Sequence, residues 1–180
     1  MRGIIFTSFL DIIQKQFGDE MIERVITLSD LENNGSYTSV GNYPSEDLMK
    51  MLTVLSSETA TPIDVLLHDF GRKLFFILEK IKPKGIADCD DPMDFLSKID
   101  SVIHAEVKKI YPDAKLPKIV FEQSTNEKAT LTYSSCRPFA KVAEGLLAGC
   151  ADFFNNRINV KALKNSNFSA HHLVFEVTRA

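Results

Sequence analysis

The chain has 180 residues, a formal net charge of −3, 44% hydrophobic residues and 25% charged residues. This length fits a single domain covering residues 1–180, and the composition excludes a mainly disordered chain. The small negative charge gives no electrostatic reason to expect nucleic acid or an anionic membrane as a partner.

The first predicted element is a helix near the N-terminus. Apolar side chains recur there at helical spacing, and they are Ile4, Ile5, Phe9, Ile12 and Ile13. Gly18 is expected to end this helix, and a short helix over Asp19–Leu28 should follow. Residues 29–44 are rich in Ser, Asn, Gly and Tyr and predict a loop.

Three further helices are predicted in the middle of the chain. Ser45 is a candidate N-cap for a helix with Leu48, Met51, Leu52 and Leu55 on its apolar face. Pro62, preceded by Thr61 as a possible cap, fits the first turn of the next helix, whose apolar positions are Val65, Leu66, Phe70, Leu74 and Leu78. Residues 82–91, with Pro83 and Gly85, interrupt the pattern. Asp91 and Pro92 then begin a helix that should run to about Tyr111, before Pro112.

After Pro117 the apolar pattern changes to the alternation of strands. Ile119 and Phe121 alternate with polar neighbours, as do Leu131 and Tyr133, and the polar stretch 123–128 between them predicts a hairpin loop. A helix is expected over residues 138–155, followed by strands over 158–163 and 173–178. Helices followed by strands, with one helix inserted, indicate an α+β fold.

The N-terminal segment, the hydrophobic stretches and the cysteines all predict a cytoplasmic protein. The N-terminal apolar run is broken by polar residues and lacks a small-residue cleavage site, so no signal peptide is expected. No stretch approaches the roughly 20 apolar residues of a membrane span. Cys89, Cys136 and Cys150 are widely separated and odd in number, which favours free, buried thiols in a reducing compartment.

His104 is the first candidate for chemistry. It lies next to Ile103 and one turn before Val107, so it sits at the edge of the apolar stripe of its helix. A histidine in that position is more often a boundary residue than a metal ligand. Asp100 lies one turn earlier and is a candidate to orient the ring, although a solvated aspartate is the more common case.

The second candidate is the segment TYSSCR, residues 132–137. In an extended chain Tyr133, Ser135 and Arg137 point to the same side and offer two hydroxyls and a guanidinium. These groups suit a carboxylate or a phosphate. Without other information, a polar sheet face with an incidental arginine is the more common explanation of such a segment.

Taken together, these residues carry a family resemblance. The N-terminal MRGIIF, a helical histidine at 104, Pro117 and the Y-x-S-x-R pattern beginning 29 residues after His104 resemble the haem nitric oxide/oxygen-binding (H-NOX) family. The family includes the haem domain of soluble guanylate cyclase. The resemblance covers nearly the whole chain and implies a helical N-terminal lobe packed on a C-terminal lobe with a small antiparallel sheet, with haem between them.

The resemblance implies a role for each candidate. His104 would be the protein ligand of the iron in haem b, and Tyr133, Ser135 and Arg137 would hold the haem carboxylates. Ile5 and Pro117 match positions that press on the haem and bend it, although ordinary packing explains them equally well. Ile5, Phe9, Leu74, Leu78, Val142 and Leu146 would approach the distal face.

The resemblance also predicts which gas is bound. Oxygen-binding members carry a tyrosine donor five residues after the arginine, and Val142 occupies that position here. A polar residue on an earlier helix is replaced by Leu74. The chain is therefore expected to bind NO and CO, with little stable oxygen binding, because no distal hydrogen-bond donor is present.

A signalling role follows from the same resemblance. NO would weaken the bond from iron to His104, and the lobes would then shift against each other. The 180 residues contain no kinase, cyclase or protease motif, so we expect a non-enzymatic sensor that signals to a separate protein, a histidine kinase or a cyclic-di-GMP enzyme.

Several alternatives remain open from the sequence. An oxygen sensor would follow if Val142 were misplaced, and a haem-free module would use residues 132–137 to bind another anion. A haem peroxidase or NO-consuming oxygenase would need a distal base or donor. Zinc is not expected, because Ala140 and Val142 replace possible ligands and the adjacent His171 and His172 would point to opposite sides of a strand.

Overall fold

The protein, seen here as a computed structural model, is described over residues 1–83, 86, 88–163 and 169–180. Gly85 lies outside the described residues. Three helices form an N-terminal lobe: α1 (Gly3–Phe17), α2 (Asp19–Leu28) and α3 (Ser45–Thr59). Gly18 ends α1 with a φ of 86°, a conformation that favours glycine, and its N–H donates to the carbonyl of Gln14.

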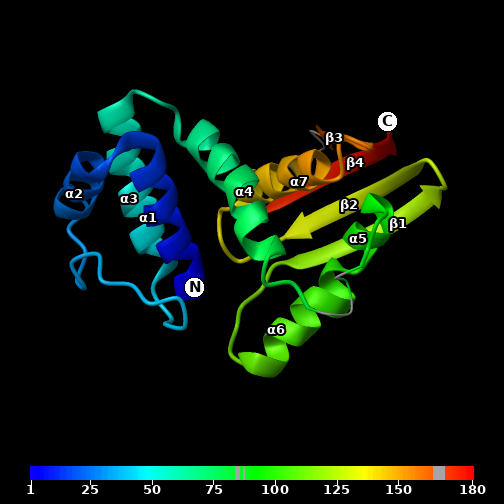
Figure 1. Ribbon diagram of the computed structural model, residues 1–180, viewed down its shortest axis with the longest axis horizontal. Helices are drawn as coiled ribbons and strands as arrows, with labels where there is room; N and C mark the ends of the chain where they lie inside the picture. Colours follow the sequence, from blue (N-terminus) through cyan, green and yellow to red (C-terminus); the bar gives the residue numbers. More distant parts are fainter. Residues whose placement is uncertain (84–85, 87, 164–168) are drawn as a thin grey trace.

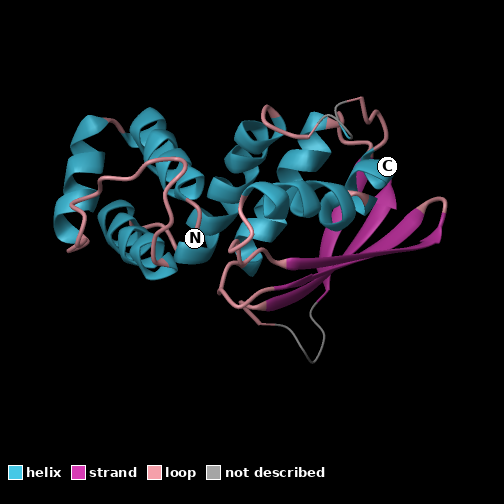
Figure 2. Cartoon of the chain, turned by 90° about the horizontal axis from the view of Figure 1, so that it is seen from below, coloured by secondary structure: helices cyan, strands magenta, loops and turns pink. Residues whose placement is uncertain are grey.

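The C-terminal lobe contains a four-stranded antiparallel sheet in the order β1-β2-β4-β3. Its strands are β1 (Lys118–Thr125), β2 (Lys128–Ser134), β3 (Ile158–Leu163) and β4 (His172–Arg179). Helix α7 (Ala140–Phe153) packs on this sheet, and Figure 2 shows the helices gathered on one side of it. The predicted α+β fold with a helical lobe and a small antiparallel sheet is confirmed.

Helix α4 (Ile63–Glu79) connects the two lobes, as Figure 1 shows. Its Phe70 and Leu74 belong to the apolar core of the N-terminal lobe, and its Phe75 belongs to the core around the sheet. Helix α7 divides its side chains in the same way, with Val142 in the first core and Leu147 in the second. The two helices therefore form the structural junction between the lobes.

Close packing of α4 and α7 depends on glycine. A Cβ atom added to Gly145 would overlap the backbone oxygen of His68, and one added to Gly71 would overlap the backbone oxygen of Val142. Neither neighbour is the movable end of a side chain. Arg72 also pairs with Asp152 across the same helices, with Nη2 donating to Oδ1 at 2.9 Å.

Gly145→Ala is expected to destabilise the protein. Alanine normally stabilises a helix interior by roughly 1 kcal/mol relative to glycine, but the overlap with His68 forces the helices apart and costs roughly 1–3 kcal/mol. Urea unfolding followed by circular dichroism measures the change in the unfolding free energy. An unchanged or raised stability would contradict the close contact.

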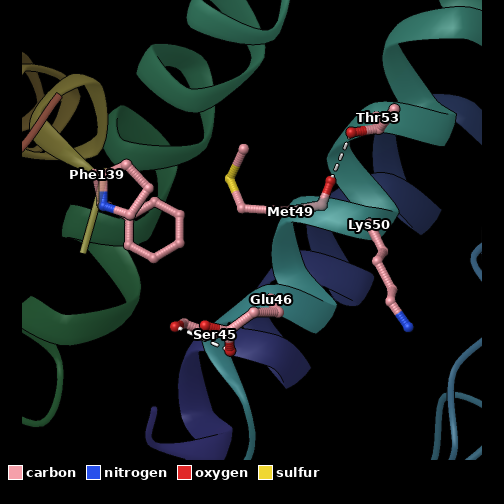
Figure 3. A pocket seen from close by; sticks show the side chains of 7 residues that line it. Ser45, Glu46, Met49, Lys50, Thr53 and Phe139 are labelled. Carbon is pink, nitrogen blue, oxygen red and sulfur yellow. Dashed lines mark hydrogen bonds between the residues drawn. The ribbon is translucent and has the colours of Figure 1, made fainter.

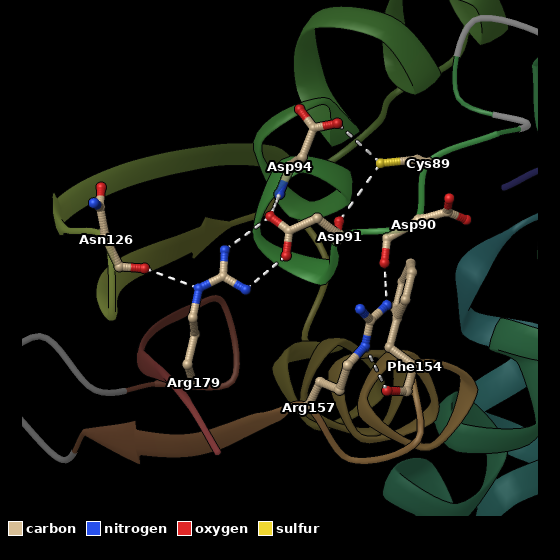
Figure 4. Close-up of polar contacts among 8 residues, drawn as sticks. All are labelled: Cys89, Asp90, Asp91, Asp94, Asn126, Phe154, Arg157 and Arg179. Carbon is tan, nitrogen blue, oxygen red and sulfur yellow. Dashed lines mark hydrogen bonds and ion pairs between the residues drawn. The ribbon is translucent and has the colours of Figure 1, made fainter.

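The helix predicted from Asp91 to about Tyr111, which includes His104, is held at its start by a residue near the C-terminus. Helix α5 (Pro92–Ser97) begins at Asp91, whose carboxylate accepts from the N–H of Asp94 at 3.3 Å and pairs with Arg179 at 2.7 Å (Figure 4). Arg179 also holds the pKa of Asp91 below its usual value. The predicted helix start at Asp91 and Pro92 is therefore confirmed.

This helix is not continuous, contrary to prediction. After α5 ends, residues Ile99–His104 form a π-helical turn, η2, and a separate helix α6 runs from Ala105 to Ile110. The Ile103 N–H donates to the carbonyl of Lys98, five residues earlier, at 3.2 Å. Such a turn adds one residue to the helix and rotates the later side chains by about 100° relative to an unbroken α-helix.

Other local predictions were wrong in part. Pro44 occupies the N-cap of α3 and Ser45 is the first helical residue, with no capping hydrogen bond. Pro62 likewise occupies the N-cap of α4, and the Thr61 hydroxyl donates to the carbonyl of Thr59. The hairpin loop is shorter than predicted, because strand pairing continues to Thr125 across from Lys128.

Exposure also differs from prediction at several side chains. Val65, expected on the apolar face of its helix, is 54% exposed. Of the three cysteines expected to be buried, Cys150 is buried, Cys89 is partly buried and Cys136 is exposed. Among the described helices, none has the length and apolar character needed to cross a membrane.

Candidate cofactor site

A cavity of about 1130 Å³ lies between the two lobes. It is larger than the roughly 300–1,000 Å³ of common small-molecule sites. Ile5 of α1, Leu74 of α4 and Val142 of α7 line it from the N-terminal side and the junction, whereas His104 and residues after β2 line it from the C-terminal lobe. A large, flat, mainly apolar molecule with polar groups at one end matches this lining.

His104 lines the cavity and forms a hydrogen bond through one of its two ring nitrogens. Its Nδ1 lies 3.0 Å from Oδ1 of Asp100, one turn earlier in η2. An ionised carboxylate only accepts hydrogen bonds, so this contact favours a ring with its proton on Nδ1 and a free lone pair on Nε2. The His104 side chain is 15% exposed and lines the cavity. Asp100 is half exposed and also contacts the ring, so the contact that would orient His104 is present.

The three polar residues predicted to act together converge on the same cavity. Tyr133, Ser135 and Arg137 all line it. Burial raises the pKa of Tyr133, so its hydroxyl stays a neutral donor. Strand β2 ends at Ser134, so the expected extended alternation does not continue to Arg137. A local turn holds the segment instead, because the Arg137 N–H donates to Oγ of Ser135 at 3.1 Å.

The Arg137 guanidinium is held beside this turn. Its Nη1 donates to the carbonyl of Lys115 at 2.6 Å, which connects the turn to the segment after α6. The remaining N–H groups and the hydroxyls of Tyr133 and Ser135 can donate to carboxylate oxygens. We call Tyr133, Ser135 and Arg137 the carboxylate clamp.

Most of the predicted apolar site residues line the cavity. They are Ile5, Leu74, Leu78, Pro117, Val142 and Leu146. Phe9 does not line it: this side chain is 2% exposed and packs edge-on against Phe70, with ring centroids 5.3 Å apart. Phe70 itself is a lining residue, so Phe9 supports the wall from behind.

Cys150 is another possible metal ligand that lines the cavity. Burial raises the pKa of its thiol to about 12, whereas metal ions bind the thiolate. His104 is therefore the better ligand. His171 and His172 instead contact Ser135 O and Ser134 Oγ at the sheet end, at 3.2 and 2.9 Å. Across the described ranges, no three or more His, Cys, Asp or Glu residues are grouped to hold a metal ion.

The haem-NO-binding family model matches residues 2–162. The chain belongs to this family. None of the curated proteins matches the chain. H-NOX domains are haem-binding gas sensors, so the cavity, His104 and the carboxylate clamp fit the cofactor of the family in both size and chemistry.

Solved H-NOX structures resemble the chain over its full length. The unliganded Fe(II) H-NOX protein from K. algicida is 35% identical, with a TM-score of 0.89 and coverage of 100% of this chain and 97% of that chain. The IWP-051-bound Shewanella woodyi H-NOX in its Fe(II)CO state is 38% identical, with a TM-score of 0.85 and coverage of 100% and 95%. The S. oneidensis protein in its Fe(II)NO state is 27% identical, with a TM-score of 0.89 and coverage of 100% and 99%.

Other lining residues of the H-NOX cavity were not found from the sequence. Arg2, Asn42, Tyr111 and Asp113 line its edge, from loops whose positions depend on tertiary contacts. The sequence pointed to this region only through the resemblance of MRGIIF to the family, and that resemblance did not identify Arg2 as a cavity residue.

A second, smaller cavity of about 320 Å³ lies between α3 and the residues that precede α7 (Figure 3). Phe139 lines both this cavity and the large one, so its ring forms part of the wall between them. Met49 faces Phe139 across the small cavity, while Lys50 points away from it. The Glu46 carboxylate accepts a hydrogen bond from the Ser45 hydroxyl at 3.4 Å. The large cavity alone holds His104 and the clamp.

Proposed function

We propose that this protein is a cytoplasmic, non-enzymatic sensor of nitric oxide that binds haem b in the interlobe cavity. The observation that carries the proposal is His104, which lines an apolar cavity, has its Nδ1 in contact with Asp100, and makes no hydrogen bond through Nε2 to the described residues. The haem would supply a ferrous iron that binds diatomic gases. His104 would hold this iron, and the carboxylate clamp would fix the orientation of the ring.

The proposed gas preference rests on the apolar residues that line the cavity away from His104. Val142, Leu74 and Leu146 are apolar and give no hydrogen-bond donor to a bound gas. Oxygen needs such a donor for stable binding more than NO and CO do. We therefore propose binding of NO and CO with little stable oxygen binding.

The signal is proposed to leave through the helix that carries His104. Loss of the bond between His104 and the iron would free η2 and α6 to move relative to α4 and α7. A π-turn has weaker hydrogen-bond geometry than an α-helix and is a common place for such functional adjustment. The receiver would be a separate histidine kinase or cyclic-di-GMP enzyme.

Visible absorption of the reduced protein tests the proposal. We expect a five-coordinate ferrous haem spectrum, a shift to a five-coordinate NO complex when NO is added, and no stable oxygen complex in air. An oxygen complex that persists in air would favour an oxygen sensor. Protein that takes up no haem after reconstitution would favour the haem-free anion-binding module.

Asp100→Ala is expected to weaken haem binding by making the His104 ring less fixed and less basic. Outer partners of metal-bound histidines commonly contribute about 10–100-fold in metal affinity. Asp100→Asn is the matched control, because its amide oxygen still accepts from Nδ1 at a similar distance. The iron–histidine stretching frequency should fall in both variants, and haem should dissociate faster mainly from Asp100→Ala. Unchanged frequencies would show that Asp100 does not act on His104.

A further inference from the structure

Two residues of the N-terminal lobe reach across the edge of the cavity. Arg2 and Asn42 pair as an isolated antiparallel bridge, supported by the Gly3 N–H donating to the Gly41 carbonyl at 2.9 Å. The Arg2 guanidinium carbon lies 3.6 Å from the centroid of the Tyr111 ring. Asn42 Nδ2 donates to Asp113 Oδ2 at 3.3 Å. Both contacts end on the segment that follows α6 in the other lobe.

The Arg2 side chain is held tightly and is partly removed from water. Its Nη2 donates to the Val40 carbonyl, and its Nε is buried without a hydrogen-bond partner among the described residues. A guanidinium that has lost water depends more on the face of an aromatic ring, because cation–π attraction strengthens with desolvation. The Tyr111 ring is therefore an important partner of Arg2.

The segment 111–117 connects the helix that follows His104 with Arg137 of the carboxylate clamp. It continues from α6, which follows His104 directly, and it contains Lys115, whose carbonyl accepts from Arg137 of the clamp. It ends at Pro117, a lining residue. Arg2, Asn42, Tyr111 and Asp113 also line the cavity. A contact between lobes at this place therefore opposes separation of the walls on either side of the cofactor.

We propose that the Arg2–Tyr111 and Asn42–Asp113 contacts form an interlobe latch that closes the edge of the cavity and retains the haem. This inference rests on the proposed haem site. The four residues are positioning residues, since they act by holding the lobes together and not by touching the iron. Parting of the lobes at this edge would open a way out for haem, so loss of one contact should increase the rate of haem release.

Tyr111→Leu tests the latch, with Tyr111→Phe as its matched control. Leucine keeps an apolar side chain but removes the ring face, whereas phenylalanine keeps the face and removes only the hydroxyl. Transfer of haem to excess apomyoglobin should be roughly threefold to tenfold faster for Tyr111→Leu. Tyr111→Phe should stay within about twofold of the unmodified protein, with the absorption spectra of all three alike. Equal rates for Tyr111→Leu and the unmodified protein would overturn the proposal.

Asn42→Asp provides a second test at the other contact. It sets a carboxylate against Asp113, so haem transfer should again be faster, and Asn42→Asp with Asp113→Asn should return toward the original rate. No rescue by Asp113→Asn would overturn this part of the latch. The rescue also separates the contact from a general loss of folding.

Hydrogen exchange of the haem-free protein separates this inference from the proposed function. The amides of Gly3 and Tyr43, which donate to Gly41 and Met1, should exchange faster in Tyr111→Leu than in Tyr111→Phe. Failure of the protein to bind haem would end the proposed function but would leave this measurement intact. Equal exchange in the two variants would overturn the latch itself.

Discussion

His104→Gly is expected to lose stable haem binding, and added imidazole is expected to restore it. The substitution removes the nitrogen that faces the cavity and leaves space for a free imidazole. The carboxylate clamp and the apolar walls remain, so the cavity can still receive haem when a ligand for the iron is supplied. The absorption band of haem, measured after purification with and without imidazole, gives the occupancy.

The rescued variant also tests the signal. Free imidazole is not attached to η2, so NO should no longer change hydrogen exchange in α6 of rescued His104→Gly, although it should do so in the original protein. His68→Ala is the control, because His68 lies on α4 and does not line the cavity. Full haem occupancy of His104→Gly without imidazole would show that another side chain holds the iron. An unaltered α6 response in the rescued variant would contradict the mechanical link.

Val142→Tyr is expected to create stable oxygen binding. Val142 lies in the first turn of α7, is 8% exposed and lines the cavity, so a hydroxyl placed from this position enters an apolar region with little competing water. A hydrogen bond to a polarised ligand contributes roughly 1.5–3 kcal/mol, which corresponds to about 10–150-fold in affinity. The reduced variant in air should show an oxygen complex that dissociates slowly enough to record.

Val142→Phe is the matched control for this gain. It adds a ring of the same size without the hydroxyl, so it tests whether bulk alone alters oxygen binding. We expect Val142→Phe to bind no more oxygen than the original protein does, while both variants still bind CO. Similar oxygen binding in the two variants would show that steric effects, not a donor, control the choice of gas.

The order and type of the secondary structure elements could be predicted because they depend on local pattern. Apolar spacing located α1, α3 and α4, and alternation located β1 and β2, while the predicted ranges for α7, β3 and β4 agree with the structure to within about two residues. The interruption of the His104 helix could not be predicted in this way. The π-turn η2 keeps helical composition, so its only signature is a five-residue hydrogen bond that the sequence does not display.

In the candidate site, too, some residues could be predicted from the sequence and others could not. The resemblance identified His104 and the carboxylate clamp, and the structure places these four residues on one cavity. The resemblance also placed Phe9 at the cavity, where Phe70 lies instead, because a matching sequence position does not show which of two rings packed edge-to-face is nearer to a ligand. For Asp100 the sequence offered a solvated carboxylate or a partner of His104 as alternatives, and in the structure the side chain is half exposed and contacts the ring.

The sequence by itself determined the α+β class and the family, and it singled out His104 and residues 132–137 as the candidate polar groups, since these depend on residue type and spacing along one chain. Only the tertiary structure decided how Arg2 meets Tyr111, how Asn42 meets Asp113 and how closely α4 approaches α7 at Gly145. Such contacts join residues that are far apart in the chain. Their geometry follows from the packing of two lobes around one cavity, which no local pattern encodes.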